Sequence, residues 1–220
     1  MRYLLASRSE YVIGIDEVGM GALAGPVAVG AVVTKVGWDH ELVKDSKKYT
    51  SSKKATAHEK RVQVLDHIIV PQVLFSTHIL MGSQRVDALG IRDAWHQCLW
   101  VVAKRSLERY PDAVVVVDGD NTGSVPTPNA VAIPKGDRLV PAVSAASILA
   151  KVNRDRVMQM LGRAYPQYGF EQHMGYGTAQ HMIALEDHGP CPVHRQSYDP
   201  VRKAEVSWQK IKQRESGMPA

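Results

Sequence analysis

Four acidic side chains in this sequence lie at or just after the ends of apolar segments. Asp16 and Glu17 end the run YVIGI, Asp118 follows VVVV, and Asp137 follows IPKG. A carboxylate held against an apolar core is costly to ionise unless a positive charge compensates it. One such acid is commonly a turn residue or a cap, but three separate strand ends favour convergence on one crevice. Oxygen ligands without histidine or cysteine nearby then favour Mg²⁺ or Mn²⁺.

The elements that must position these acids follow from the hydrophobic pattern. β-Branched and apolar runs predict strands over 11–17, 26–34, 70–80, 113–120 and 129–133. Helical periodicity predicts helices over 51–67, 91–109, 142–163 and 178–188. Strands followed by strands that alternate with helices predict a mixed α/β sheet.

Composition limits the class of protein. The 220 residues carry a formal net charge of +5, with 45% apolar residues and two cysteines. No apolar run reaches about 18 residues, so a membrane span is not expected. The N-terminus does not resemble a secretory signal, and two cysteines make no disulfide framework, which favours a cytoplasmic protein. Basic charge indicates a polyanionic partner, although each basic group alone is typical of a solvated helix face.

Three other motifs could indicate a different kind of site, and none of them fits its pattern. GMGALAG is followed by an apolar strand, whereas a dinucleotide-binding loop must open a helix. DGDNTG begins like a calcium loop, but the twelfth position is Asn129 rather than glutamate. A zinc cluster could be drawn from residues whose spacing fits no standard structural site: His181, His188, Cys191 and His194.

A family resemblance joins these features. IGIDEVGMGALAGPVAVGAVV (13–33) resembles the opening motif of type 2 ribonucleases H, the ribonuclease HII family. The likeness recurs in order in the blocks DSKKYTSSKK, VDALGI, VVVDG, KGD, SAASILAKVNRDRVM, YPQYGF, GYGT and PVHRQSY. It covers about residues 11–200.

The resemblance implies a ribonuclease H-like α/β fold, with a five-stranded mixed sheet flanked by helices and a small C-terminal helical segment. It implies a catalytic domain over 1–164 and a helical and loop segment over 165–220 that completes the substrate groove, with the tail after about 200 peripheral. The family's catalytic, metal-binding acids map onto Asp16, Glu17, Asp118 and Asp137.

The implied activity is metal-dependent hydrolysis of RNA in RNA–DNA hybrids, and cutting 5′ to ribonucleotides embedded in duplex DNA. Two Mg²⁺ or Mn²⁺ ions about 4 Å apart are expected in the substrate complex, with 5′-phosphate and 3′-hydroxyl products. Such an enzyme would act in ribonucleotide excision repair and DNA replication. The alternative is a hybrid-binding protein that retains the fold with little or no activity.

The resemblance also implies substrate contacts. Backbone groups of Gly19, Met20 and Gly21 would approach the 2′-hydroxyl, and Tyr176 would stack on the following sugar. Phosphates would be held by Ser46, Lys47 and Lys48, with contributions from Lys151 and Arg154.

Two positions depart from the family pattern, and both lack a cation. Met20 and Met174 stand where arginine and lysine are usual, so we expect weaker phosphate contacts. The tail has no adjacent aromatic pair of the kind that docks on a sliding clamp, so no such partner is expected from it. A monomer is expected because one chain carries the catalytic set.

Overall fold

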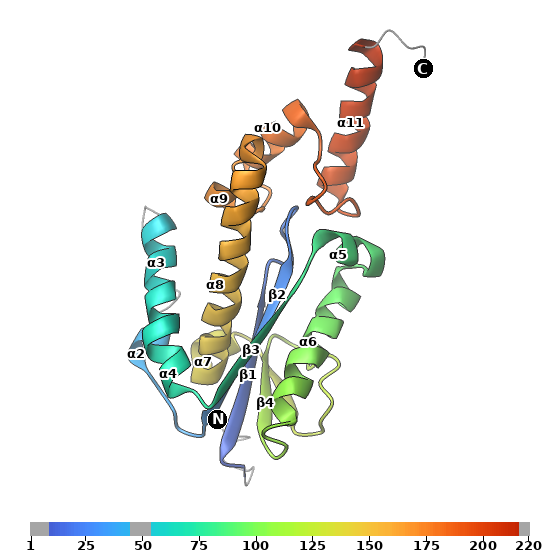
Figure 1. Cartoon of the computed structure of the whole chain (residues 1–220). Helices are drawn as coiled ribbons and strands as arrows, with labels where there is room; N and C mark the ends of the chain where they lie inside the picture. The colour runs from blue at the N-terminus through green and yellow to red at the C-terminus, as the bar shows by residue number, and fades with distance from the viewer. Residues whose placement is uncertain (1–8, 45–53, 216–220) are drawn as a thin grey trace. The chain divides into compact units, whose positions relative to one another are not determined.

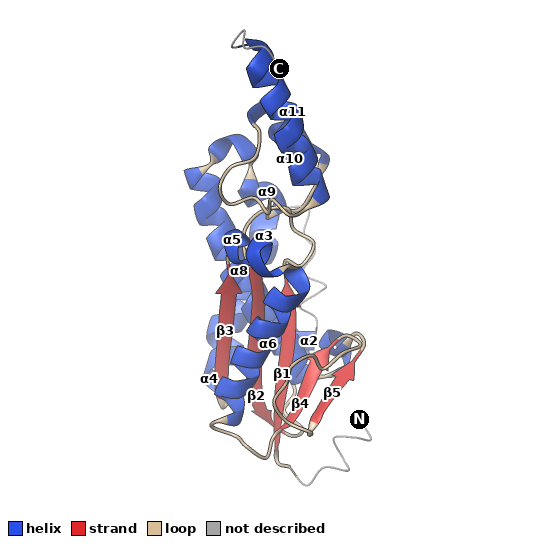
Figure 2. Cartoon of the chain, turned by 90° about the vertical axis from the view of Figure 1, so that its right-hand side faces the viewer, coloured by secondary structure: helices blue, strands red, loops and turns tan. Residues whose placement is uncertain are grey.

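The computed structural model of the chain describes residues 9–44 and 54–215, and within them it forms a five-stranded mixed sheet, as predicted (Figures 1 and 2). The strands are β1 (Tyr11–Val18), β2 (Val27–Lys35), β3 (Phe75–Met81), β4 (Val114–Asp118) and β5 (Ala130–Ile133). Their order in the sheet is β3-β2-β1-β4-β5. β1 pairs antiparallel with β2 and parallel with β4, and β4 pairs parallel with β5.

Helices cover the sheet. α6 (Ile91–Leu107) lies on one face, and α3 (Lys54–Val64) and the first part of α8 (Pro141–Ala164) lie on the other (Figures 1 and 2). The remaining helical segments are α2 (Glu41–Lys44), the π-helix η2 (Leu65–Ile69), α4 (Val70–Gln72), α5 (Ser83–Leu89), α7 (Gly136–Leu139), η3 (Pro166–Tyr168), α9 (Phe170–His173), α10 (Ala179–His188) and α11 (Asp199–Glu215). No described helix is long and apolar enough to cross a bilayer.

Some predicted elements were wrong in place or were missed. The strand predicted over 70–80 begins only at Phe75, because helical structure continues through Gln72. Pro71 lies near the end of this continuous helical run, directly after the π-helix η2, and the helix stops one residue later at Gln72. The polar tail is the helix α11, and its beginning is buried through Val201 and Ala204.

The chain divides into two compact units, which interleave in sequence. Unit 1 comprises Met1–Val18, Ala28–Leu80 and Trp95–Arg154. Unit 2 comprises Gly19–Val27, Met81–Ala94 and Asp155–Ala220. The sequence-based boundary between 164 and 165 stays a prediction.

Unit 1 depends on an unusually close approach between the sheet and α8. A Cβ built on Gly14 would lie 2.2 Å from the carbonyl carbon of Ala142, and one built on Gly30 would lie 2.7 Å from the carbonyl oxygen of Ala146. The same face of the helix contributes Ala145 to an apolar cluster with β2, α3 and η2. Small residues on both sides therefore let the helix backbone rest on the strands.

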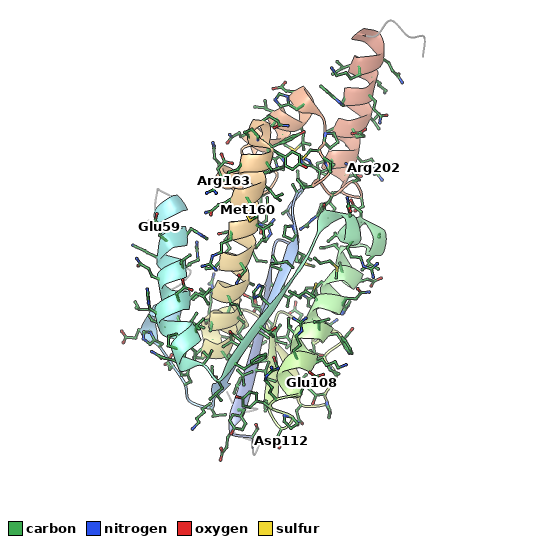
Figure 3. The ribbon with its side chains drawn as sticks, viewed as in Figure 1. Glu59, Glu108, Asp112, Met160, Arg163 and Arg202 are labelled. Atoms are coloured by element: carbon green, nitrogen blue, oxygen red, sulfur yellow. The ribbon has the colours of Figure 1, made fainter. Side chains whose placement is uncertain are left out.

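Unit 2 has its own apolar core. Met158 of α8 packs with Tyr168 and Phe170, and these rings are stacked with centroids 5.3 Å apart. The opposite side of the same helix carries Met160 and Arg163, which are exposed (Figure 3). The part of α8 that belongs to unit 2 thus also has one buried side and one exposed side.

Candidate active site

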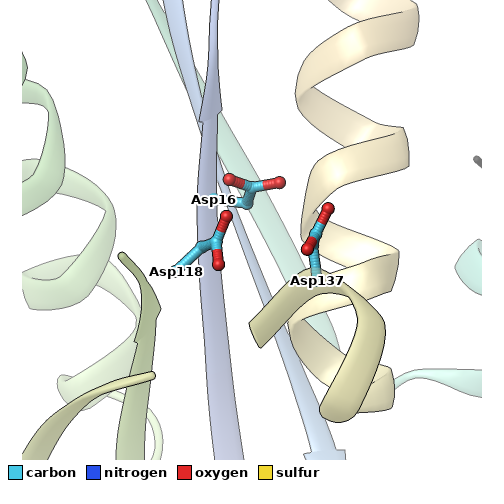
Figure 4. A group of neighbouring side chains, drawn as sticks. All are labelled: Asp16, Asp118 and Asp137. Carbon is cyan, nitrogen blue, oxygen red and sulfur yellow. The ribbon is translucent and has the colours of Figure 1, made fainter. Parts of the chain in front are cut away.

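Three carboxylates converge in unit 1. Asp16, Asp118 and Asp137 each offer an oxygen, and these oxygens lie within 4.8 Å of one another. Their side chains point toward a common space from β1, β4 and α7 (Figure 4). Asp16 and Asp137 are buried, 5% and 4% exposed, and Asp118 is half-buried. Hard oxygen donors crowded in this way fit a Mg²⁺ or Mn²⁺ ion.

The sheet register places the first two acids side by side. β1 and β4 run parallel with Gly14 beside Val116 and Ile15 beside Val117. One residue further along, Asp16 comes beside Asp118, and side chains two apart share a face. Because Gly14 and Asp16 face the same way, Asp16 points toward α8, where Ser147 hydrogen-bonds to its carboxylate.

Asp137 is delivered by the short helix α7. Lys135, just before this helix, has a left-handed backbone with φ of 61°, which turns the chain sharply after β5. The Gly136 N–H donates to Asp118 Oδ1 at 2.6 Å, and the Ser144 hydroxyl donates to the Asp137 carbonyl at 2.5 Å. Both bonds tie the α7 turn to its neighbours and so orient two of the three acids.

Glu17 lies apart from this group. It belongs to β1, which continues to Val18, so its side chain takes the face opposite to that of Asp16. There the Trp95 indole N–H, at the start of α6, donates to Glu17 Oε2 at 3.3 Å. The strand predicted over 11–17 therefore extends one residue further, and Glu17 lies within β1 rather than at its end. Trp95 was not recognised from the sequence, because an indole in an amphipathic helix is typical of packing.

Burial and mutual repulsion disfavour ionisation of these acids. Burial, opposed in part by the hydrogen bond from Ser147 and reinforced by the charges of Glu17 and Asp118, raises the pKa of Asp16 from 3.8 to about 7. Burial also raises the pKa of Glu17, and the charge of Asp118 adds to that effect. A divalent cation would reverse both shifts, because it favours the ionised form.

We expect stabilisation by Mn²⁺ to be larger at pH 8 than at pH 5.5. In the metal-free protein the pKa of Asp16 is higher folded than unfolded, so the free energy of unfolding falls as pH rises from about 4 to about 7. Above about pH 7 the carboxylate is ionised and ready to bind metal, whereas protons compete below it. Melting temperatures in EDTA and in MnCl₂ at both pH values measure the difference. An equal Mn²⁺ effect at both would contradict this prediction.

The loop residues expected to contact sugar lie in unit 2. Gly19 is buried, Met20 is half-buried and Gly21 is exposed. Tyr176 is 37% exposed, and it follows Gly175, whose carbonyl accepts the Leu23 N–H at 2.8 Å. The segment 19–25 and the segment that carries Tyr176 are thus joined directly by a backbone hydrogen bond.

The residues expected to hold phosphates are less uniform. Ser46, Lys47 and Lys48 lie outside the described residues. Lys151 is half-buried, whereas Arg154 has no exposed surface. A phosphate could reach Arg154 only if the surrounding packing opened, so its burial argues against the predicted contact.

Two of the histidines in the candidate zinc cluster, His181 and His194, are instead hydrogen-bonded to each other. Cys191 N–H donates to His194 Nδ1 at 2.9 Å, so His194 Nε2 carries the proton and donates to His181 Nε2 at 3.0 Å. His181 Nδ1–H then donates to the Tyr176 carbonyl at 3.0 Å. Burial lowers the pKa of both imidazoles to about 4, so both are neutral near pH 7. Their nitrogens support the loop of Tyr176 rather than a metal ion.

Comparison with known proteins covers most of the chain. A family model described as Ribonuclease HII matches residues 13–201. The Ribonuclease HII of Xanthobacter autotrophicus is 42% identical over 207 residues, which span 93% of this chain and 78% of that protein. In solved structures, Bst-RNase HIII in complex with Mn²⁺ matches with a TM-score of 0.69 at 16% identity, covering 94% of this chain and 73% of that one. A chain of the PCNA:RNase HII complex from Archaeoglobus fulgidus matches with a TM-score of 0.64 at 22% identity, covering 84% and 92%.

Proposed function

Because the chain belongs to the ribonuclease HII family, and is therefore an endonuclease of the ribonuclease H type, we propose that it cuts 5′ to ribonucleotides embedded in duplex DNA as well as within RNA–DNA hybrids. The observation that carries the proposal is the convergence of Asp16, Asp118 and Asp137 on one space. Ribonuclease H enzymes use divalent metal ions, and a site of carboxylate oxygens alone fits such ions.

The chain's own residues would act mainly by holding and orienting. Asp16, Asp118 and Asp137 would hold Mg²⁺ or Mn²⁺, and we propose Glu17 as a fourth ligand on the family resemblance, which requires its side chain to leave the Trp95 indole. When bound, two such ions supply positive charge that activates water and offsets the charge of the phosphate. Gly136 keeps Asp118 oriented through its N–H, which limits the motion of that carboxylate. Hydrolysis would leave a 5′-phosphate and a 3′-hydroxyl without a covalent enzyme intermediate.

Selection of the ribonucleotide would fall to unit 2. We place Gly19, Met20 and Gly21 at the ribose 2′-hydroxyl, because it alone distinguishes the two sugars and because Gly21 leaves open space for a close approach. Tyr176 would stack on the following sugar, and its exposed ring supports this role. Lys151 would add a phosphate contact, together with Ser46, Lys47 and Lys48.

Partners and setting are proposed on the same family basis. The enzyme would act as a monomer in the cytoplasm, in ribonucleotide excision repair and DNA replication. The archaeal complex was solved with PCNA, but at 22% identity that likeness carries only the fold. A partner of this kind is not proposed for the tail, which has no pair of adjacent aromatics.

One assay tests the proposed function against the alternative of a hybrid-binding protein without activity. The protein is incubated with Mg²⁺ or Mn²⁺ and a duplex carrying one ribonucleotide, beside an all-DNA duplex and the Asp118→Asn variant. We expect wild type to cut the first duplex alone, 5′ to the ribonucleotide, and Asp118→Asn to leave it intact. Tight binding without cleavage would favour the alternative, and cleavage that persists in Asp118→Asn would contradict the assigned site.

A further inference from the structure

Arg195 is a buried cation that contacts the glycine segment of unit 2, residues 19–25. Its side chain has no exposed surface. Nε and Nη2 donate to the Gly25 carbonyl at 3.1 and 3.0 Å, and Nη1 donates to the Met20 carbonyl at 2.9 Å and to the Tyr198 hydroxyl at 3.0 Å. Burying a guanidinium is costly, and buried charge is a poor source of stability. What these bonds do is hold the Met20 and Gly25 carbonyls in fixed orientations.

The Met20 carbonyl is held from two directions. It accepts from Arg195 Nη1 and also from the Tyr198 hydroxyl at 2.6 Å. A carbonyl oxygen has two lone pairs, and both are occupied. This carbonyl is therefore fixed toward the interior and is not available to accept a hydrogen bond from substrate.

Fixing the Met20 carbonyl also fixes the next N–H. The peptide bonds of the described chain include no cis bond, and in a trans peptide the C=O and the following N–H point in opposite directions. With the Met20 oxygen turned toward Arg195, the Gly21 N–H is turned away from it. Gly21 is exposed, a Cβ there would meet no atom within 4 Å, and none of the described residues accepts its N–H.

The rest of the segment is fixed on both edges. Leu23 N–H donates to the Gly175 carbonyl at 2.8 Å, on the side of Tyr176. On the other side, Arg195 N–H donates to the Leu23 carbonyl at 2.8 Å, and Gly25 N–H donates to the Val193 carbonyl at 2.9 Å. The peptide between Met20 and Gly21 is thus the exposed part of an otherwise immobilised strip.

We propose that Arg195 and Tyr198 are positioning residues that clamp the Met20 carbonyl inward, so that the Gly21 N–H is presented to an oxygen of the substrate's sugar–phosphate backbone. The proposal rests on the proposed function and adds residues to which the sequence assigned no role. The donor would serve either a ribose hydroxyl or a phosphate oxygen, because both accept from a backbone N–H.

Tyr198→Phe tests the clamp, with Tyr168→Phe as a matched control. Both substitutions remove one hydroxyl that donates to a backbone carbonyl at 2.6 Å in unit 2, to Met20 in one case and to Gly189 in the other. For cleavage of the single-ribonucleotide duplex we expect Tyr198→Phe to raise KM about threefold, as the loss of one neutral hydrogen bond predicts. Tyr168→Phe should lower the melting temperature at least as much and leave KM unchanged.

Arg195→Lys is the stronger variant, because one ammonium group cannot reproduce the guanidinium fork on two carbonyls. We expect KM to rise about tenfold or more, by the loss of charge-assisted bonds. Binding of ribonucleotide-containing and all-DNA duplexes in EDTA separates the two acceptors: weakening of the first alone identifies the ribose hydroxyl, and equal weakening identifies phosphate.

The clamp is wrong if Tyr198→Phe and Arg195→Lys change KM and duplex binding no more than Tyr168→Phe does. Should Arg195→Lys fail to fold, Tyr198→Phe and its control still decide. Failure of the proposed function would look different, because wild type itself would then not cut the ribonucleotide duplex. The binding measurements in EDTA would still test the clamp in that case.

Discussion

Asp16→Asn is expected to abolish cleavage and, in the absence of metal, to make the protein more stable at pH 8. Asparagine keeps an oxygen that can accept the Glu17 N–H, as Asp16 Oδ1 does at 2.8 Å, but it carries no charge to hold a cation. Bound metal stabilises the transition state by several kcal/mol, and losing that stabilisation corresponds to roughly a thousandfold or greater fall in kcat. The same change removes an ionised carboxyl whose pKa is raised by burial to about 7, which destabilises the metal-free folded state by a few kcal/mol.

In the Asp16→Asn variant the cleavage rate should therefore fall while the melting temperature without metal rises. We would measure single-turnover cleavage with Mn²⁺ and melting temperatures in EDTA at pH 8, with the exposed Asp112→Asn as the matched control. The control should change neither quantity. A variant that lost activity because it had lost its fold would show a lower melting temperature, which is the outcome that contradicts this account.

Gly14→Ala is expected to be the most destabilising single methyl addition in β1. The new Cβ would lie 2.2 Å from the Ala142 carbonyl carbon and 2.3 Å from the Val143 nitrogen, so the start of α8 would have to move off the sheet. Overpacking against a rigid backbone costs about 3 kcal/mol or more, which lowers the melting temperature of a chain of this size by roughly 6–12 °C. Activity should fall as well, because Asp16 is two residues away on the same face.

Gly82→Ala supplies the comparison for this variant. A Cβ at Gly82 would meet nothing within 4 Å, and its φ of −67° suits any residue. Thermal unfolding of both variants should separate them clearly. Equal melting temperatures would show that the sheet and α8 can part without cost, contrary to the packing described.

Much of this fold was predictable because its signals are periodic or continuous. The valine run that ends in Asp118 predicted a buried strand, and residues 141–164 form a helix close to the predicted 142–163. The short helices α5, α7 and α9 have four to seven residues, too few to show a period. The helix α11 was not predicted because it is polar overall and buries only a few side chains near its start, such as Val201.

The site was predictable in residue type but not in arrangement. Acids at strand ends indicated Asp16, Asp118 and Asp137, since sheet edges gather side chains that are distant in sequence. Which face Glu17 takes depends on where β1 ends, and no local signal marks that point. The clamp of Arg195 on the Met20 carbonyl could not be found from sequence. Every residue has a backbone carbonyl, so the residue type at position 20 does not indicate such a bond.

Because Asp16 and Glu17 point to opposite faces of β1, the group of Asp16, Asp118 and Asp137 depends on the exact number of residues in this strand. Inserting one residue in β1 before Asp16 would turn every later side chain to the other face and put the apolar Ile15 in the place of Asp16, whereas deleting one would put the longer Glu17 there. A change of two residues would restore the faces but slide Asp16 past Asp118 along the parallel register. Variation in the length of this chain can therefore be tolerated in its loops, but β1 has a fixed count of residues.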